Sequence, residues 1–172
     1  NIELIVSGSA ALQPRLARVF AAADIPVMEG YGLTETSPVI AVNDQRNKGF
    51  RIGTVGRPIR NVEVKIAEDG EILAKGPNVM LGYYKDKEMT DSVIDKDGWF
   101  HTGDIGILDE GKFLKITDRK KSIFKTSAGK YVAPQIIENL LTESGFIDQA
   151  MVVGYQRKFC SALIVPDYGN AK

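Results

Sequence analysis

The apolar and polar positions at the start of the chain predict a strand, a helix and a second strand. Residues 2–6 (IELIV) form a short apolar run that is typical of a buried strand. Apolar side chains then recur at helical spacing, at Leu12, Leu16, Val19 and Phe20. Residues 25–28 (IPVM) follow as a second buried strand. Residues 31–36 (YGLTET) therefore lie at the carboxyl end of a strand, where open α/β sheets bind ligands.

From about Gly53 the pattern changes to short alternating segments separated by tight turns. Residues 62–66 and 71–75 are joined by the turn residues 68–70 (EDG), which predicts a hairpin. Glycine and proline recur every few residues, at Gly53, Gly56, Pro58, Gly76, Pro77 and Gly82. This region is expected to form a small barrel or sandwich.

The last third of the chain alternates strands with one helix. Residues 122–125 are expected to be a strand, and a glycine-containing loop and a helix that Pro134 opens come next. Strands near residues 151–154 and 161–165 follow, and Cys160 is expected to be a small core residue beside the second of them. The whole pattern predicts a mixed α+β fold.

Composition limits the classes of function only modestly. The 172 residues have room for one ordinary domain or two small ones, and Lys plus Arg (22) equals Asp plus Glu (22), so no net charge points to nucleic acid. The single cysteine rules out a disulfide framework and suits a cytoplasmic protein. The chain starts at Asn1 directly before a strand, which suggests a fragment of a longer protein.

The segment YGLTET has the groups that a nucleotide needs. Tyr31 has no obvious core role and could stack on a base, while Gly32 lets backbone approach a ligand. The hydroxyls of Thr34 and Thr36 suit a phosphate, and Glu35 suits Mg²⁺, which proteins bind through one or two carboxylates plus substrate phosphates. The alternative is an ordinary polar turn.

A second candidate is Asp104 in GWFHTGDIG. It is expected in a turn between Gly103 and Ile105, where its carboxylate is presented and could accept both hydroxyls of a ribose. The alternative is an aspartate that bonds the backbone of its own turn. His101, the only histidine, has no cysteine or serine beside it and suggests neither a metal site nor a triad, so we expect it to pack beside aromatic neighbours.

Two other motifs are rejected. Residues 106–112 (GILDEGK) have the spacing of a phosphate-binding P-loop, but Phe113 replaces the required Ser or Thr and a hairpin turn is expected there. Residues 95–98 (DKDG) lack the third acid and the final Glu of a calcium loop.

Cations dominate residues 112–130, where Asp118 is the only acid. They are Lys112, Lys115, Arg119, Lys120, Lys121, Lys125 and Lys130. Such a run is usually a solvated face, but at a junction between two domains it would also suit a polyanionic ligand.

Six motifs occur in order and carry a resemblance: SGSAAL, YGLTET, GTVGRP, GEILAKGPNVMLGYY, GWFHTGDIG and TDRKKSIFKTSAGKYVAPQIIENLL. Together they resemble the adenylate-forming (AMP-binding) acyl-CoA synthetase family, and the last motif is most similar to its long-chain fatty acid CoA ligases. The resemblance implies a ligase that activates a fatty acid with ATP and Mg²⁺ as an acyl adenylate. It then implies transfer of the acyl group to coenzyme A.

The resemblance also implies roles for individual residues. For the adenine and the acyl group these are Ser9, Ala10, Glu29, Gly30 and Tyr31. For phosphate, Mg²⁺ and ribose they are Thr34, Glu35, Asp104 and Arg119, with Glu35 as the metal ligand. Lys121 matches the hinge of the small carboxyl-terminal domain, and residues 127–130, with Ala128 and Gly129, match the loop that approaches coenzyme A.

Three pieces are expected from this resemblance. Residues 1–46 would end the large AMP-binding domain, residues 47–117 would be the barrel-like subdomain, and residues 118–172 would be part of a carboxyl-terminal lid domain. The family's phosphate loop and its adenylation lysine have no match here, so the 172 residues alone are expected to be inactive and to expose apolar edges that favour self-association. Peripheral membrane contact of the full-length protein stays open.

Two alternatives also stay open. One is an adenylate-forming enzyme for another acid, such as an aryl or medium-chain acid, or a peptide-synthetase activation domain. The other is a nucleotide-binding module without turnover.

Overall fold

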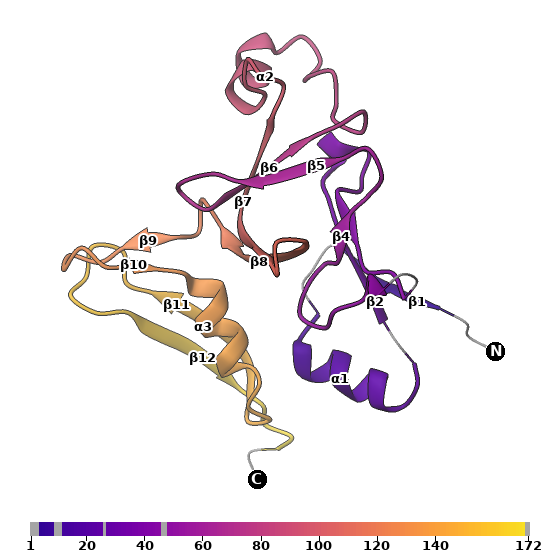
Figure 1. Ribbon diagram of the computed structural model, residues 1–172. Helices are drawn as coiled ribbons and strands as arrows, with labels where there is room; N and C mark the ends of the chain where they lie inside the picture. The colour runs from indigo at the N-terminus through magenta and orange to yellow at the C-terminus, as the bar shows by residue number, and fades with distance from the viewer. Residues whose placement is uncertain (1–3, 9–11, 26, 46–47, 171–172) are drawn as a thin grey trace. The chain divides into compact units, whose positions relative to one another are not determined.

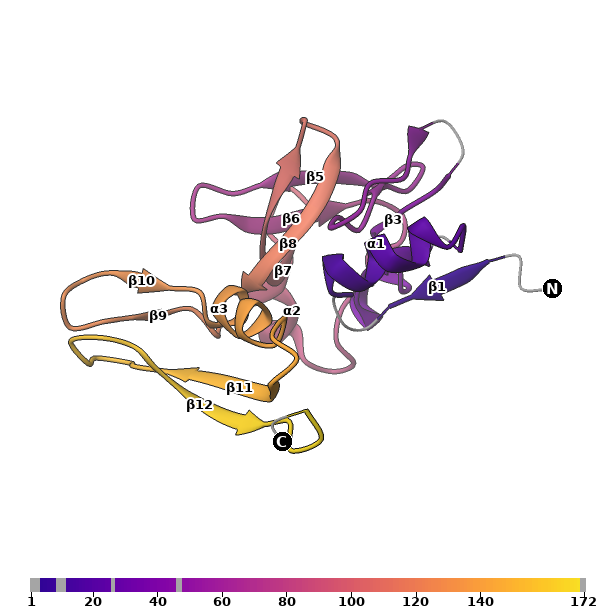
Figure 2. The same ribbon diagram turned by 90° about the horizontal axis from the view of Figure 1, so that it is seen from below.

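The computed structural model describes residues 4–8, 12–25, 27–45 and 48–170 (Figures 1 and 2). The chain divides into two compact units, Asn1–Ile116 and Thr117–Lys172. The mixed α+β fold predicted from the sequence is confirmed. Within the described residues, no helix is both long and apolar enough to cross a lipid bilayer.

The first unit begins with the predicted β-α-β arrangement. Strand β1 (Ile5–Ser7) pairs in parallel with β2 (Val27–Tyr31), and α1 (Pro14–Ala22) connects them with its proline in the first turn. Two short antiparallel strands, β3 (Ala41–Val42) and β4 (Arg57–Pro58), extend the sheet in the order β1-β2-β3-β4. The 3-10 turn η1 (Thr34–Thr36) lies between β2 and β3.

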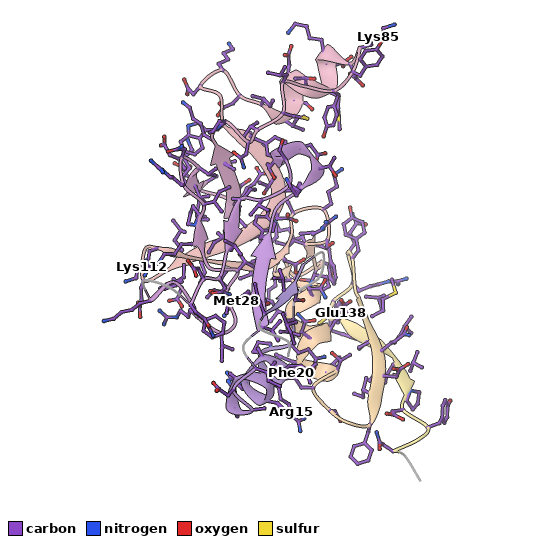
Figure 3. The ribbon with its side chains drawn as sticks, turned by 90° about the vertical axis from the view of Figure 1, so that its right-hand side faces the viewer. Arg15, Phe20, Met28, Lys85, Lys112 and Glu138 are labelled. Carbon is purple, nitrogen blue, oxygen red and sulfur yellow. The ribbon has the colours of Figure 1, made fainter. Side chains whose placement is uncertain are left out.

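The apolar face of α1 packs less than its pattern predicts. Ala17 is buried, whereas Leu16, Val19 and Phe20 are 45%, 59% and 38% exposed. Figure 3 marks Phe20 on α1 and Met28 in the buried part of β2. The helix therefore leaves apolar surface uncovered by the described part of the chain.

The region predicted to be barrel-like is a curled four-stranded sheet. Its order is β5 (Glu63–Ile66), β6 (Glu71–Lys75), β7 (Phe100–Asp109) and β8 (Phe113–Arg119), and the expected hairpin joins β5 to β6. Helix α2 (Lys87–Val93) lies between β6 and β7, and the side chain of Asp86 accepts a hydrogen bond from the Met89 N–H at its first turn.

One apolar core joins the two sheets of the first unit. The buried residues come from β3, β6, β8 and the segments beside them; they are Ile40, Ala41, Val62, Ile72, Ala74 and Leu114. This shared core fixes the end of β2 against the larger sheet, which positions the candidate site.

The described residues of the second unit form two hairpins and one helix. Strands β9 (Phe124–Lys125) and β10 (Tyr131–Val132) pair antiparallel, α3 (Pro134–Leu141) follows, and β11 (Ile147–Val153) pairs antiparallel with β12 (Ser161–Pro166). The expected core position of Cys160 is wrong, because this residue is an exposed free thiol directly before β12. Most side chains of β12 are exposed as well, so the apolar run does not form a core strand.

Candidate functional site

The structure brings Tyr31 and Asp104 together, although they lie 73 positions apart in the sequence. The Tyr31 hydroxyl donates a hydrogen bond of 2.7 Å to Asp104 Oδ2. Two expectations need correction here. Tyr31 ends β2 and its ring packs against the core, so it does have a core role. Asp104 lies within β7 and is only 5% exposed, so it is not presented on a turn.

The loop after Tyr31 exposes one hydroxyl and buries another. The Thr36 hydroxyl accepts the Leu33 N–H at 3.0 Å and is fully buried, whereas Thr34 is exposed. Gly32 is required by the loop itself, because a Cβ atom there would lie 1.7 Å from the Pro38 carbonyl oxygen. Thr34 is therefore the hydroxyl of this loop that can reach a phosphate.

Glu35 is held in place by a residue that the sequence did not single out. Tyr83 donates a hydrogen bond of 2.8 Å to Glu35 Oε1, and the Met80 N–H donates to the Glu35 carbonyl oxygen at 2.8 Å. Burial, and then the bond to the Glu35 carboxylate, raise the pKa of Tyr83. The motif GEILAKGPNVMLGYY contained this tyrosine, but its partner lies 48 positions away.

The side chains of Glu35 and Thr34 suit a Mg²⁺ ion that is also bound by substrate phosphates, rather than a metal ion whose ligands all come from the protein. Among the described residues, no group of three or more His, Cys, Asp or Glu side chains could hold a metal ion. Mg²⁺ is commonly bound by one or two carboxylates plus substrate phosphates. Glu35, beside the exposed Thr34 hydroxyl, fits that mode because a carboxylate that accepts the Tyr83 bond keeps acceptor capacity for a cation.

Glu29 and Gly30 occupy the preceding positions of β2. Glu29 is buried, its Oε1 accepts the Leu12 N–H at 3.3 Å, and burial raises the pKa of this carboxyl group. Gly30 pairs with Val42 of β3. Ser9 and Ala10 lie outside the described residues, so their expected contact with adenine stays a prediction.

The remaining predicted residues belong to the second unit. Arg119 ends β8, and Lys121 lies in the exposed turn that follows. Ala128 and Gly129 lie in the turn between β9 and β10, where Gly129 has a φ of +82° and Ala128 needs no such conformation. The convergence of Arg119 with Tyr31 and Asp104 stays a prediction.

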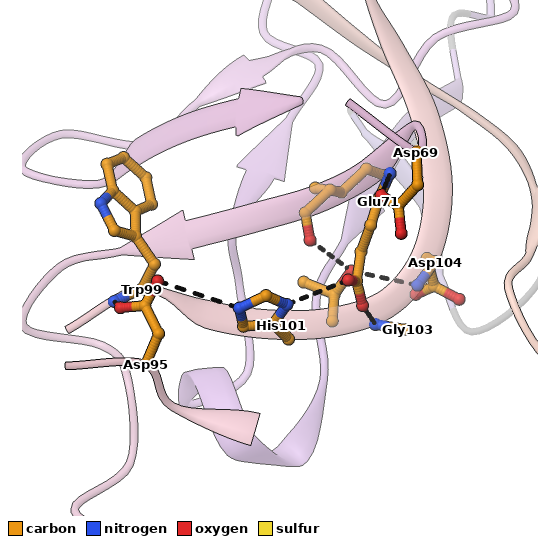
Figure 4. Close-up of polar contacts among 9 residues, drawn as sticks. Asp69, Glu71, Asp95, Trp99, His101, Gly103 and Asp104 are labelled. Atoms are coloured by element: carbon orange, nitrogen blue, oxygen red, sulfur yellow. Dashed lines mark hydrogen bonds and ion pairs between the residues drawn. The ribbon is translucent and has the colours of Figure 1, made fainter. Parts of the chain in front are cut away.

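His101 does more than pack beside aromatic rings, which corrects that expectation. Its Nδ1 lies 3.0 Å from Glu71 Oε2 and its Nε2 lies 3.9 Å from Asp95 Oδ2 (Figure 4). Asp95 also accepts the N–H groups of Asp97 and Trp99, so DKDG is a turn closed by its first aspartate. Residues 109–112 form the turn from β7 to β8, as predicted when the P-loop was rejected.

Strands β2 and β7 belong to separate sheets of this α+β protein, and the Tyr31–Asp104 hydrogen bond joins them. The family model for AMP-binding enzymes matches residues 1–84, and that for the AMP-binding enzyme C-terminal domain matches residues 121–172. The chain belongs to the AMP-binding enzyme family.

Curated relatives are fatty acid ligases. A long-chain-fatty-acid–CoA ligase, FadD15 of Mycobacterium bovis, is 43% identical over 167 residues, which cover 97% of this chain and 27% of the relative. The peroxisomal long chain acyl-CoA synthetase 7 of Arabidopsis thaliana is 44% identical over 142 residues, 74% of this chain and 20% of that protein. The chain thus spans about a quarter of the length of such relatives.

Solved structures of adenylate-forming enzymes share the fold. The o-succinylbenzoate CoA synthetase MenE of Bacillus subtilis, in complex with its acyl-adenylate intermediate, superposes with a TM-score of 0.85 at 29% identity, covering 96% of this chain and 36% of MenE. The amide bond synthetase McbA of Marinactinospora thermotolerans has a TM-score of 0.80 at 32% identity, covering 98% of this chain and 37% of McbA.

Proposed function

We propose that this chain forms part of an ATP-dependent ligase for long-chain fatty acids. The carboxylate would attack the α-phosphate of ATP to give an acyl adenylate and pyrophosphate, and the thiol of coenzyme A would then displace AMP to give the acyl-CoA. The identity to long-chain fatty acid ligases supports the substrate class. Fatty acid, ATP and coenzyme A are the proposed partners, in a cytoplasmic or membrane-associated enzyme.

The Tyr31–Asp104 hydrogen bond is the observation that carries the proposal. The bond fixes an aromatic ring beside a carboxylate, and these groups suit an adenine and its ribose. A carboxylate accepts two hydroxyl hydrogen bonds well, and such charge-assisted bonds are the strong kind. The proposed ligand is therefore the nucleoside part of an adenylate.

The groups for the phosphate lie on the next residues of the chain. In the proposal the Thr34 hydroxyl bonds the α-phosphate and Glu35, held by Tyr83, binds Mg²⁺. Mg²⁺ when bound would neutralise charge on the phosphates. Arg119 would add a fixed cation, so the reaction would need electrostatic stabilisation and no protein nucleophile.

The second unit would serve the thiol step. In the proposal Lys121 is a hinge, since it lies in an exposed turn after β8. The turn at Ala128 and Gly129 would approach coenzyme A. Both roles rest on the resemblance of TDRKKSIFKTSAGK.

Titration of the 172-residue chain with AMP, followed by NMR, tests the nucleotide site. We expect weak binding that perturbs the Tyr31 and Asp104 signals, and a loss of at least about tenfold in affinity for Asp104→Ala, because two charge-assisted bonds are removed and each is worth about tenfold or more. Glu68→Gln in the exposed β5–β6 turn is the matched control and should bind as the wild type does. An Asp104→Ala variant with unchanged AMP affinity would contradict the proposed role.

A second candidate is an adenylate-forming enzyme that uses another acid or acceptor, which the structural similarity to MenE and McbA favours. AMP release by a full-length protein containing this chain, measured with a panel of acids, separates the candidates. The proposal expects the highest rate with long-chain fatty acids. An aryl or medium-chain preference would support the second candidate, and AMP binding without turnover would indicate a non-catalytic module.

A further inference from the structure

Strand β7 carries a bulge at the position of Asp104. Leu73 of β6 pairs with His101, whereas Glu71 pairs with Ile105. The β7 residues between these two pairs, Thr102 to Asp104, therefore stand opposite Ile72 alone. Gly103 in the middle has a φ of +73°, which a residue with a side chain adopts only under strain. Bulges of this kind redirect side chains and occur often beside active sites.

A buried carboxylate stabilises the bulge from the neighbouring strand. Glu71 is only 4% exposed; its Oε1 accepts the Gly103 N–H at 2.9 Å and its Oε2 lies 3.0 Å from His101 Nδ1 (Figure 4). When Glu71 is ionised its carboxylate can only accept, and His101 then carries its proton on Nδ1. One side chain thus bonds the residue before the bulge and the glycine inside it.

The hydroxyl of Thr102 stabilises the same bulge from within. Thr102 Oγ1 donates to the Ile72 carbonyl oxygen at 2.8 Å and accepts the Asp104 N–H at 3.1 Å. The Asp104 carboxylate in turn accepts the hydrogen bond of 2.7 Å from the Tyr31 hydroxyl. Glu71 thus holds the backbone of Gly103 and Thr102 holds that of Asp104, and Gly103 is the residue directly before the aspartate of the candidate site.

We infer that Glu71, together with His101, is a positioning residue that holds the β7 bulge and so aims Asp104 at the ribose of the nucleotide. Glu71 is buried and acts through Gly103, so it need not touch the ligand itself. An unpaired buried carboxylate is costly, and the His101 and Gly103 donors offset that cost. The inference rests on the proposed function, because it takes Asp104 as the ribose acceptor.

The test compares AMP with 2′,3′-dideoxy-AMP, which lacks both ribose hydroxyls, by NMR titration of the 172-residue chain. The wild type is expected to bind AMP at least about tenfold more tightly than the dideoxy nucleotide, because the dideoxy nucleotide lacks both hydroxyls that would donate to the Asp104 carboxylate. Glu71→Ala should lose most of this preference and still bind the dideoxy nucleotide within about twofold of the wild type. A general loss of structure would weaken both nucleotides equally.

Three further variants sharpen the test. Glu71→Gln keeps an acceptor for Gly103 and should retain most of the ribose preference. Thr102→Val keeps side-chain volume, removes the hydroxyl of the bulge and should lower the preference, which provides a test if Glu71→Ala does not fold. Glu63→Gln, on an exposed position of β5, should match the wild type.

The outcomes separate the inference from the proposed function. If Glu71→Ala folds and keeps the full preference for AMP, the positioning role is wrong while the nucleotide site stands. The inference is also wrong if Glu71→Ala does not fold and Thr102→Val keeps that preference. If the wild type itself does not distinguish the two nucleotides, the ribose role of Asp104 and the inference both fail.

Discussion

The Tyr83 hydroxyl is a single group whose removal should be visible by titration. It donates to Glu35 Oε1, and burial and this carboxylate both raise the pKa of Tyr83 above its ordinary value of about 10. The stability that neutral Tyr83 contributes is therefore present below about pH 10 and is lost as pH rises through its higher folded pKa. Tyr83→Phe should remove one late-ionising tyrosine from a phenolate absorbance titration.

Tyr84, the neighbouring residue, provides the control for this titration. Its side chain is 87% exposed, so Tyr84→Phe should leave the late-ionising group in place. If the late-ionising tyrosine is lost in Tyr84→Phe and kept in Tyr83→Phe, the hydrogen bond from Tyr83 to Glu35 is contradicted.

Gly32 should not tolerate a side chain. A Cβ atom there would lie 1.7 Å from backbone, whereas one at Gly30 would make ordinary contacts of 3.8 Å. Gly32→Ala is expected to lower the free energy of unfolding by about 1–3 kcal/mol through overpacking, and Gly30→Ala by much less. Urea unfolding followed by the fluorescence of Trp99, the only tryptophan, measures both in the first unit. Equal stability of the two variants would contradict the described loop.

The motifs singled out candidate side chains but did not predict their hydrogen-bond partners. Tyr31, Glu35 and Asp104 could be selected because their residue types suit base, metal and ribose. Their partners depend on tertiary structure: the hydroxyl of Tyr83 reaches Glu35 across 48 positions, and Glu71 reaches the bulge across more than 30. No local pattern carries such information.

The junction of β8 and α3 gives a prediction about pH. Asp118, near the end of β8, is 3% exposed; it accepts the Arg119 N–H at 2.6 Å and a backbone bond from Gln135 in the first turn of α3. Burial raises the pKa of Asp118, and Glu138 on α3 (Figure 3) adds to this. Asp118 Oδ2 is buried with no hydrogen-bond partner.

The stability of Asp118→Asn relative to the wild type should therefore increase as pH rises. A carboxyl group with a raised folded pKa contributes stability that is fully present below its unfolded pKa of about 3.9 and is lost as pH rises through the folded value. The Tm of Asp118→Asn minus that of the wild type should increase from about pH 4 upward, as thermal unfolding at several pH values would measure. Asp148→Asn, at an exposed position of β11, is the control. A constant difference in Tm would contradict the assignment.

Strands and helices were predictable where side-chain spacing sets them. The helical spacing around Leu16 predicted α1 and Pro134 predicted the start of α3, while turn residues predicted the β5–β6 hairpin and the turn between β7 and β8. Helix α2 was not predicted. The bulge in β7 was not predictable, because GWFHTGDIG gives no sign of which β6 residues it faces. The exposure of β12 was missed because an apolar run does not reveal whether another layer covers it.

For the chain as a whole, the uncovered face of α1 predicts self-association. Leu16, Val19 and Phe20 are exposed on one helix, and β1 is an edge strand of its sheet. We expect the 172-residue chain to form dimers or larger species through this face as its concentration rises. Sedimentation velocity of Leu16→Gln/Val19→Gln should show less association, while Arg18→Gln on the same helix should not. A monomeric wild type at all concentrations would contradict this prediction.

The packing of the two sheets of the first unit around one core was the feature that the sequence predicted least well. Motifs in the correct order predicted a family, which the family models confirm. They did not predict that the candidate site residue Tyr31 would also pack against the core, because this depends on how two sheets share one core.

The exposed thiol at position 160 has a practical consequence. Since the chain has one cysteine and one tryptophan, a maleimide dye would attach to the second unit at a single point while Trp99 stays the only intrinsic donor in the first. Resonance energy transfer between the two would follow their separation in solution. Adding nucleotide to such a labelled sample would reveal directly whether ligand binding draws the halves of the molecule together.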